Sequence, residues 1–174
     1  MKIIMIYDQI QSGLGTKDDN MMPLGGVREA IGPAVIMAPH LARENLQVSA
    51  CLYCGSGLFL SDPSEVSRKL CAMVRKLSPE VVVCGPAYDF RDYGEMCACI
   101  AADIADNENI PAIAAMAKVN KAVIERFKGR IPIVKTPMKG EAGMRQALEN
   151  ICALAGSLAR GEPADDLIRR VCFL

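Results

Sequence analysis

The sequence predicts an α/β fold, a doubly wound and mostly parallel sheet of the Rossmann or flavodoxin-like type with helices on both faces. Two observations predict it. Short apolar runs without polar alternation are typical of strands that helices cover on both sides, and they occur at residues 3–7, 48–53, 81–84, 110–115 and 131–134. These runs alternate with stretches of helical period, and right-handed crossovers of that kind build a doubly wound sheet.

The helix boundaries carry local signals. Asp62-Pro63-Ser64-Glu65 offers an N-cap acid, a proline at the first helical position and a glutamate at the third. An apolar stripe follows this start, and Ser78-Pro79 ends it directly before the strand at 81–84. Further helices are expected at residues 93–106, with Asp92 as its cap, and at 141–160. Another helix is expected to start near Pro33, and Pro39 should kink or restart it.

Length and charge restrict the class of protein. The chain has 174 residues, of which 51% are hydrophobic and 23% charged, so residues 1–174 are expected to form one globular domain. Basic and acidic residues both number 20, which leaves no positive field to hold nucleic acid or an anionic membrane. Neither a signal peptide nor a membrane-spanning run is present. A cytoplasmic protein is therefore expected, with its cysteines as reduced thiols.

The working surface is expected where the strands end, because ligands of open α/β sheets bind at the carboxyl ends of the strands. Residues 9–32, 54–57 and 85–94 follow three of the strands. Glycines in these segments allow the backbone to approach a ligand closely, and the candidates are Gly13, Gly15, Gly55 and Gly85. The pair Gly13 and Gly15 lacks the third glycine of a dinucleotide fingerprint, and no phosphate-loop motif occurs, so nucleotide binding is not favoured.

Three cysteines are candidate nucleophiles. Cys54 and Cys84 each precede a glycine at a strand end and are expected to be exposed. Cys97 lies in the first turns of the helix predicted at 93–106, where the helix dipole favours a thiolate. Cys51 is expected to pack in the core, since a strand points it away from Cys54. No metal site is predicted, because no strong ligand motif is present, and the one histidine, His40, is not favoured as a catalytic base.

Polar residues crowd the loop after the strand at 81–84. Tyr88, Arg91 and Tyr93 are interpreted either as a solvated loop or as the wall of a polar pocket. Arg28 and Arg91 are the candidates to hold a substrate carboxylate, because a guanidinium matches that group with two hydrogen bonds.

Gly85-Pro86-Ala87-Tyr88, then Tyr93-Gly94 and Cys97, resembles a stretch of selenoprotein B, a component B subunit of the glycine, sarcosine and betaine reductases. Further matches lie at residues 28–33, 54–55, 110–112, 134–136 and 142–145, so the order is kept along almost the whole chain. The resemblance covers only the N-terminal part of that family. The region with the selenocysteine-x-x-Cys motif is absent from these residues, which contain no selenocysteine.

The resemblance implies a component-B-like subunit of an anaerobic amino-acid reductase system, an oxidoreductase that cleaves C–N bonds reductively. It implies that the chain binds a small amino-acid or amine substrate or scaffolds the complex. The redox centre would lie elsewhere, with a pyruvoyl group or selenocysteine on partner subunits and no cofactor in this chain. Two alternatives stay open: a stand-alone cysteine-dependent oxidoreductase, and a non-catalytic small-molecule-binding protein. Exposed apolar strand edges are also compatible with a homo-oligomer.

Overall fold

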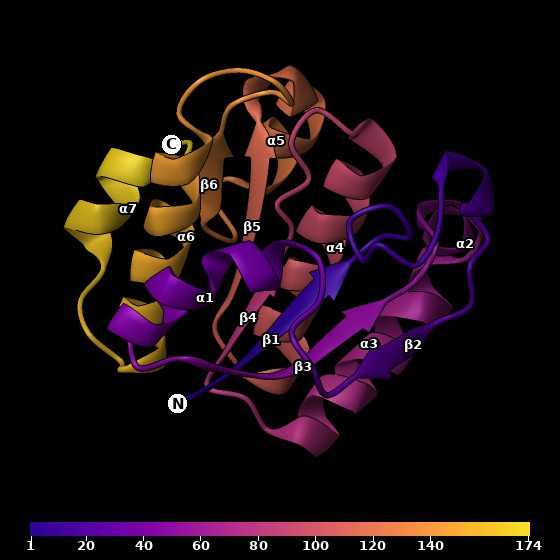
Figure 1. Ribbon diagram of the computed structural model, residues 1–174, viewed down its shortest axis with the longest axis horizontal. Helices are drawn as coiled ribbons and strands as arrows, with labels where there is room; N and C mark the ends of the chain where they lie inside the picture. Colours follow the sequence, from indigo (N-terminus) through magenta and orange to yellow (C-terminus); the bar gives the residue numbers. More distant parts are fainter.

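A six-stranded sheet forms the centre of the structure, a computed structural model that describes residues 1–174 (Figure 1). The strand order is β2-β3-β1-β4-β5-β6, and all neighbours are parallel except β2, which runs antiparallel to β3. Without β2 this is the flavodoxin-like order, so the predicted fold class is confirmed. The strands are β1 (Lys2–Tyr7), β2 (Gly25–Val27), β3 (Gln47–Tyr53), β4 (Val81–Cys84), β5 (Ala112–Ala117) and β6 (Ile133–Thr136).

Helices cover both faces of the sheet (Figure 1). One face carries α1 (Pro33–Arg43), α6 (Met144–Ala159) and α7 (Asp165–Val171). The other face carries α2 (Ser56–Ser61), α3 (Pro63–Leu77), α4 (Arg91–Glu108) and α5 (Lys121–Phe127). Short 3-10 turns lie at Lys17–Asp19 and Lys118–Asn120. None of the helices combines the length and apolar character needed to cross a membrane.

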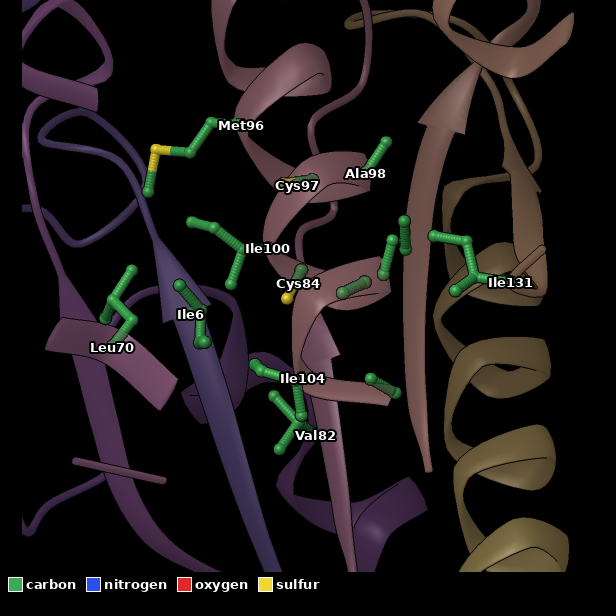
Figure 2. Close-up of a cluster of buried hydrophobic side chains, with 14 of the residues drawn as sticks. Ile6, Leu70, Val82, Cys84, Met96, Cys97, Ala98, Ile100, Ile104 and Ile131 are labelled. Atoms are coloured by element: carbon green, nitrogen blue, oxygen red, sulfur yellow. The ribbon is translucent and has the colours of Figure 1, made fainter. Parts of the chain in front are cut away.

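The core divides into two clusters because side chains alternate along each strand. In β1, Ile4 and Ile6 enter the cluster under α3 and α4, while Ile3 and Met5 enter the cluster under α1 and α6. Figure 2 shows the first cluster, where Ile6 and Cys84 of the sheet face Ile100 of α4. The central strands are therefore buried on both faces, as their continuous apolar sequence predicts.

Most boundaries agree with the sequence signals. The helix start at Asp62 is confirmed, because its side chain accepts a hydrogen bond from the Glu65 amide at 3.2 Å. The helix expected at 93–106 spans Arg91–Glu108. The role given to Asp92 is wrong, since Phe90 occupies the N-cap position and Asp92 lies within the first turn. Pro39 lies inside α1, which continues through it as a single helix.

Four elements had not been expected from the sequence, namely β2, α2, α5 and α7. All are short: β2 has three residues, α2 six, and α5 and α7 seven each. Segments of that length show few periods of any apolar pattern. Tertiary contacts with the sheet and longer helices fix them instead.

The two-sided burial predicts where truncation is costly. Ile100→Ala should lower the free energy of unfolding by about 2–5 kcal/mol, because it opens a cavity in the packed cluster. Ile36→Ala removes the same atoms from a helix position that is 67% exposed, and should change stability by less than about 0.5 kcal/mol. Urea unfolding of both variants measures the difference. Equal losses would contradict the placement of α4 on the sheet.

Candidate functional site

The polar site lies where the direction of strand addition reverses. The chain passes from β1 to β3 on one side and then crosses to β4 on the other side. Ligands of such sheets bind outside the carboxyl ends of the strands at this point. A pocket of about 290 Å³ lies there, and its lining residues come from the loops after β1, β3 and β4: Asp8, Gln9, Ile10, Lys17, Asn20, Ser56, Phe90, Arg91, Asp92 and Tyr93.

Asp8 is the deepest charged group of the pocket. It directly follows β1, and the residue is only 1% exposed. Its Oδ1 accepts a hydrogen bond from the Gln11 amide at 2.6 Å. Burial raises the pKa of the carboxyl, and backbone amides of the same turn oppose that effect only in part. No lysine or arginine forms an ion pair with it.

Gln9 joins the loop after β1 to the loop after β3. The side chain is buried, and its Oε1 accepts a hydrogen bond from the Ser56 amide at 3.0 Å. Ser56 is the first residue of α2, so this bond uses one of the amides that a helix start leaves without a partner. Since Oε1 is engaged, the Nε2 group is the end of the amide that is left to donate to a ligand.

The segment between β1 and β2 lies against the start of α2 at residues 20–22 (Figure 1). The Gly55 amide donates to Met22 O at 2.8 Å, and the Leu58 amide donates to Asn20 O at 2.9 Å. A Cβ at Gly55 would lie 2.0 Å from Asn20 O, so only glycine permits this approach. This contact brings Lys17 and Asn20 to the pocket.

The loop after β4 is held by the neighbouring strand. Ala87 N donates to Ala115 O at 2.8 Å, and Tyr88 O accepts from both Ala117 N and Asn120 Nδ2 at 2.8 Å. Tyr93, on the first turn of α4, donates its hydroxyl to Ile6 O at 2.9 Å and is 1% exposed. These bonds fix the start of α4 beside the end of β1.

Charges of both signs surround the pocket without pairing. Lys17, Arg91 and Asp92 are exposed at its rim, and none of them forms an ion pair or a side-chain hydrogen bond. Arg75 is paired with Glu108 at 2.7 Å, whereas Arg28, Arg43 and Arg170, like Arg91, have no ion pair. The unpaired charges can therefore interact with a ligand that carries both charges.

The thiols lie below this surface. Cys54 and Cys84 had been expected to be exposed, and this is wrong, because both are 0% exposed. The Cys54 thiol contacts Met96 Sδ at 3.9 Å, and Cys84 faces α4 beside Cys97 (Figure 2). Burial raises the pKa of Cys54 to about 12 and raises those of Cys84 and Cys97 as well. At neutral pH these thiols are protonated. Cys51 packs in the opposite cluster, as predicted.

The other predicted residues divide between the pocket and its supports. Arg91 and Tyr93 line the pocket. Gly55 precedes the lining residue Ser56, and Gly85, Pro86 and Tyr88 form the loop that leads to α4 without lining the pocket. Gly13 and Gly15 lie in the loop after β1 but not in the lining.

Arg28 is exposed just after β2 and is not part of this pocket. Gln9, Lys17, Asn20 and Ser56 lie within the segments 9–32 and 54–57 that were expected at the working surface, but they had not been singled out. Asp8 lies just outside those segments, although the rule on strand ends applies to it too, because it directly follows β1.

A second hollow lies between α3 and α4, away from the strand ends. It measures about 430 Å³ and includes Ser67, Arg75, Asp103 and Glu108. Its polar groups satisfy each other, since Ser67 Oγ bonds Asp103 and Arg75 pairs with Glu108. It therefore lacks the unpaired groups of the pocket at the strand ends. No group of three or more His, Cys, Asp or Glu side chains is arranged to hold a metal ion.

Residues 1–167 match the protein family described as glycine/sarcosine/betaine reductase selenoprotein B. The chain belongs to this family. Selenoprotein B family members similar to it include the glycine reductase complex component B subunit gamma of Carboxydothermus hydrogenoformans, 30% identical over 76% of this chain and 30% of that protein. The same subunit of Peptoclostridium acidaminophilum is 26% identical over 93% of this chain and 36% of that protein.

The sarcosine reductase complex component B subunit beta of Peptoclostridium acidaminophilum is 24% identical, again over 93% of this chain and 36% of that protein. This selenoprotein B family chain thus spans about a third of the length of the curated relatives it matches. No solved structure matches it.

Because the three thiols are buried, we expect them to react slowly with a thiol-specific reagent. In the native chain at neutral pH, Cys54, Cys84 and Cys97 should react with a disulfide reagent at least about tenfold more slowly than in urea, because burial keeps them protonated and inaccessible. Mass spectrometry of the trapped peptides assigns each site. Rapid labelling of any of the three thiols in the folded chain would contradict their burial and would support the hypothesis of a nucleophilic cysteine.

The close approach at Gly55 predicts a local packing defect. Gly55→Ala should destabilise the chain by about 1–3 kcal/mol, because the added methyl meets backbone atoms of Asn20. Gly129→Ala is the matched control, since nothing lies within 4 Å of its Cβ position and its φ is not positive. Thermal unfolding distinguishes them, and equal melting temperatures would show that the loop does not pack on α2.

Proposed function

We propose that the chain acts as a component-B-like subunit of a glycine/sarcosine/betaine-type reductase system and binds a small amino acid or amine in the pocket outside β1, β3 and β4. The observation that carries the proposal is the gathering of unpaired charges of both signs around this pocket. Family membership supports the complex, because the similar proteins are named as subunits of glycine and sarcosine reductase complexes.

The dimensions of the pocket favour a small ligand. Its volume of about 290 Å³ is at the lower end of the range for small-molecule sites. An amino acid carries an ammonium and a carboxylate a few ångströms apart. Arg91 at the rim offers a planar fork that matches a carboxylate, and Lys17 adds a second positive charge. The buried Gln9 amide, which also lines the pocket, supplies a neutral donor.

In this proposal the chain binds and orients the substrate, and the reductive step takes place on other groups. The selenoprotein B resemblance implies a pyruvoyl group or selenocysteine on partner subunits, and those groups would do the bond cleavage. The cysteines of this chain are poor substitutes, since burial raises their pKa values. Scaffolding of the complex and formation of a homo-oligomer stay predictions.

A non-catalytic small-molecule-binding protein is the second candidate. The pocket favours it over a stand-alone cysteine-dependent oxidoreductase, because no cysteine is among the residues that line the pocket. The two hypotheses, a reductase subunit and an isolated binding protein, differ in whether the chain associates with other subunits. Purification of the tagged 174-residue chain from its native cells in low salt should recover other reductase subunits. Recovery of the chain alone would favour the isolated binding protein.

The two candidate arginines give a direct test of the pocket. Arg91→Ala should weaken glycine binding by on the order of 10-fold or more, because it removes a charged hydrogen-bond donor from the rim. Arg28→Ala removes an exposed arginine outside the pocket and should leave the affinity unchanged. Isothermal titration with glycine and sarcosine provides the comparison. If Arg28→Ala caused the loss and Arg91→Ala did not, the site would lie elsewhere.

A further inference from the structure

We propose that Asp8 forms a cation subsite at the floor of this pocket, where its carboxylate accepts hydrogen bonds from a primary or secondary ammonium of the ligand. The inference rests on the proposed function and adds to it the residue that binds the ammonium group of the ligand. It also predicts a preference among ligands, because a quaternary ammonium has no N–H group to donate.

The carboxylate of Asp8 has no cationic partner within the protein. Asp8 is 1% exposed, and it has no ion-pair partner. A buried carboxylate without a cation is costly, and such groups are normally paired. The hydrogen bonds that the carboxyl accepts come from backbone amides of its own turn, among them the Gln11 amide to Oδ1. No side chain of the protein donates to the carboxyl, so the charge lacks the cationic partner that we assign to the ligand.

The turn at Asp8 does not require a charge. An asparagine side chain accepts the same amide bond and forms the same turn after a strand. An aspartate at this depth therefore carries a penalty that the local backbone does not explain. A ligand cation removes that penalty on binding, since it supplies the missing partner.

The surroundings of Asp8 allow one orientation of a zwitterionic ligand. Uncharged groups pack around the floor, namely the Tyr93 ring and Cys97 of α4 and Cys54 after β3. The positive groups are Lys17 and Arg91, and both lie at the exposed rim with Asp92. An ammonium group is thus drawn to the floor and a carboxylate to the rim. Gln9 also lines the pocket, and its Nε2 group is a donor.

The raised pKa of Asp8 predicts how the unfolding temperature changes when this residue is replaced. Burial raises the pKa of Asp8, so ionisation of this carboxyl costs folding free energy that an uncharged amide at the same position would not cost. Asp8→Asn should therefore unfold at the same temperature as the wild type or at a higher one. A residue kept only for structure would instead lower the unfolding temperature when it is replaced.

The experiment compares Asp8→Asn with the wild-type chain by isothermal titration. Glycine affinity should fall on the order of 10- to 100-fold, because a charged hydrogen bond is lost at a buried site. Affinity for betaine, which has no N–H group, should be weaker than for glycine in the wild type. It should also fall less in the variant. Asp18→Asn is the control, since Asp18 is exposed beside Lys17 but does not line the pocket; it should bind glycine as the wild type does.

Three outcomes separate the two claims. Equal glycine affinity in Asp8→Asn and the wild type overturns the role of Asp8 and leaves substrate binding by the pocket intact. A wild-type chain that binds none of glycine, sarcosine and betaine overturns both claims. If Asp8→Asn fails to fold, the wild-type pH profile decides. Glycine affinity should fall as the pH is lowered below neutral, because burial raises the pKa of Asp8 and protonation removes the charge that binds the ammonium; a flat profile overturns the inference.

Discussion

The burial of the sheet on both faces is the constraint on which the rest of the structure depends. Because α1 and α6 cover one face and α3 and α4 the other, β1 and β4 have no free face to offer a ligand. Polar groups can act only where the strands end. The reversal of strand order between β1 and β4 opens space at that edge, and the residues after β1, β3 and β4 line it. The site follows from the topology before any side chain is considered.

That constraint explains what the sequence could predict. Continuous apolar runs predict buried parallel strands, and Val81–Cys84 is a strand with the bounds that its sequence indicates. A polar pocket also lies at the strand ends, where the sequence placed its candidate site. What failed was the direction of single side chains at those ends. Cys54 and Cys84 precede glycines, yet α2 and α4 cover them, and the sequence did not reveal that α2 begins at Ser56. Asp8 was overlooked although it occupies the same kind of position.

The same burial separates the thiols from the polar pocket. The thiols pack under the pocket with raised pKa values, while the unpaired charges line it. The chain spans about a third of its curated relatives and contains no selenocysteine. In the proposed function, the buried carboxylate of Asp8 costs stability and gains its partner when the ligand binds.

The most direct test of the account is a map of ligand-induced chemical shifts on the isotope-labelled 174-residue chain. Titration with glycine should move the backbone amide signals of Gln9, Gln11 and Ser56, which lie at the floor and at the start of α2. Signals of Ser67 and Glu108, in the hollow between α3 and α4, should stay in place. Shifts confined to that hollow, or no shifts at saturating glycine, would contradict the claim that the strand-end pocket is where this protein binds its substrate.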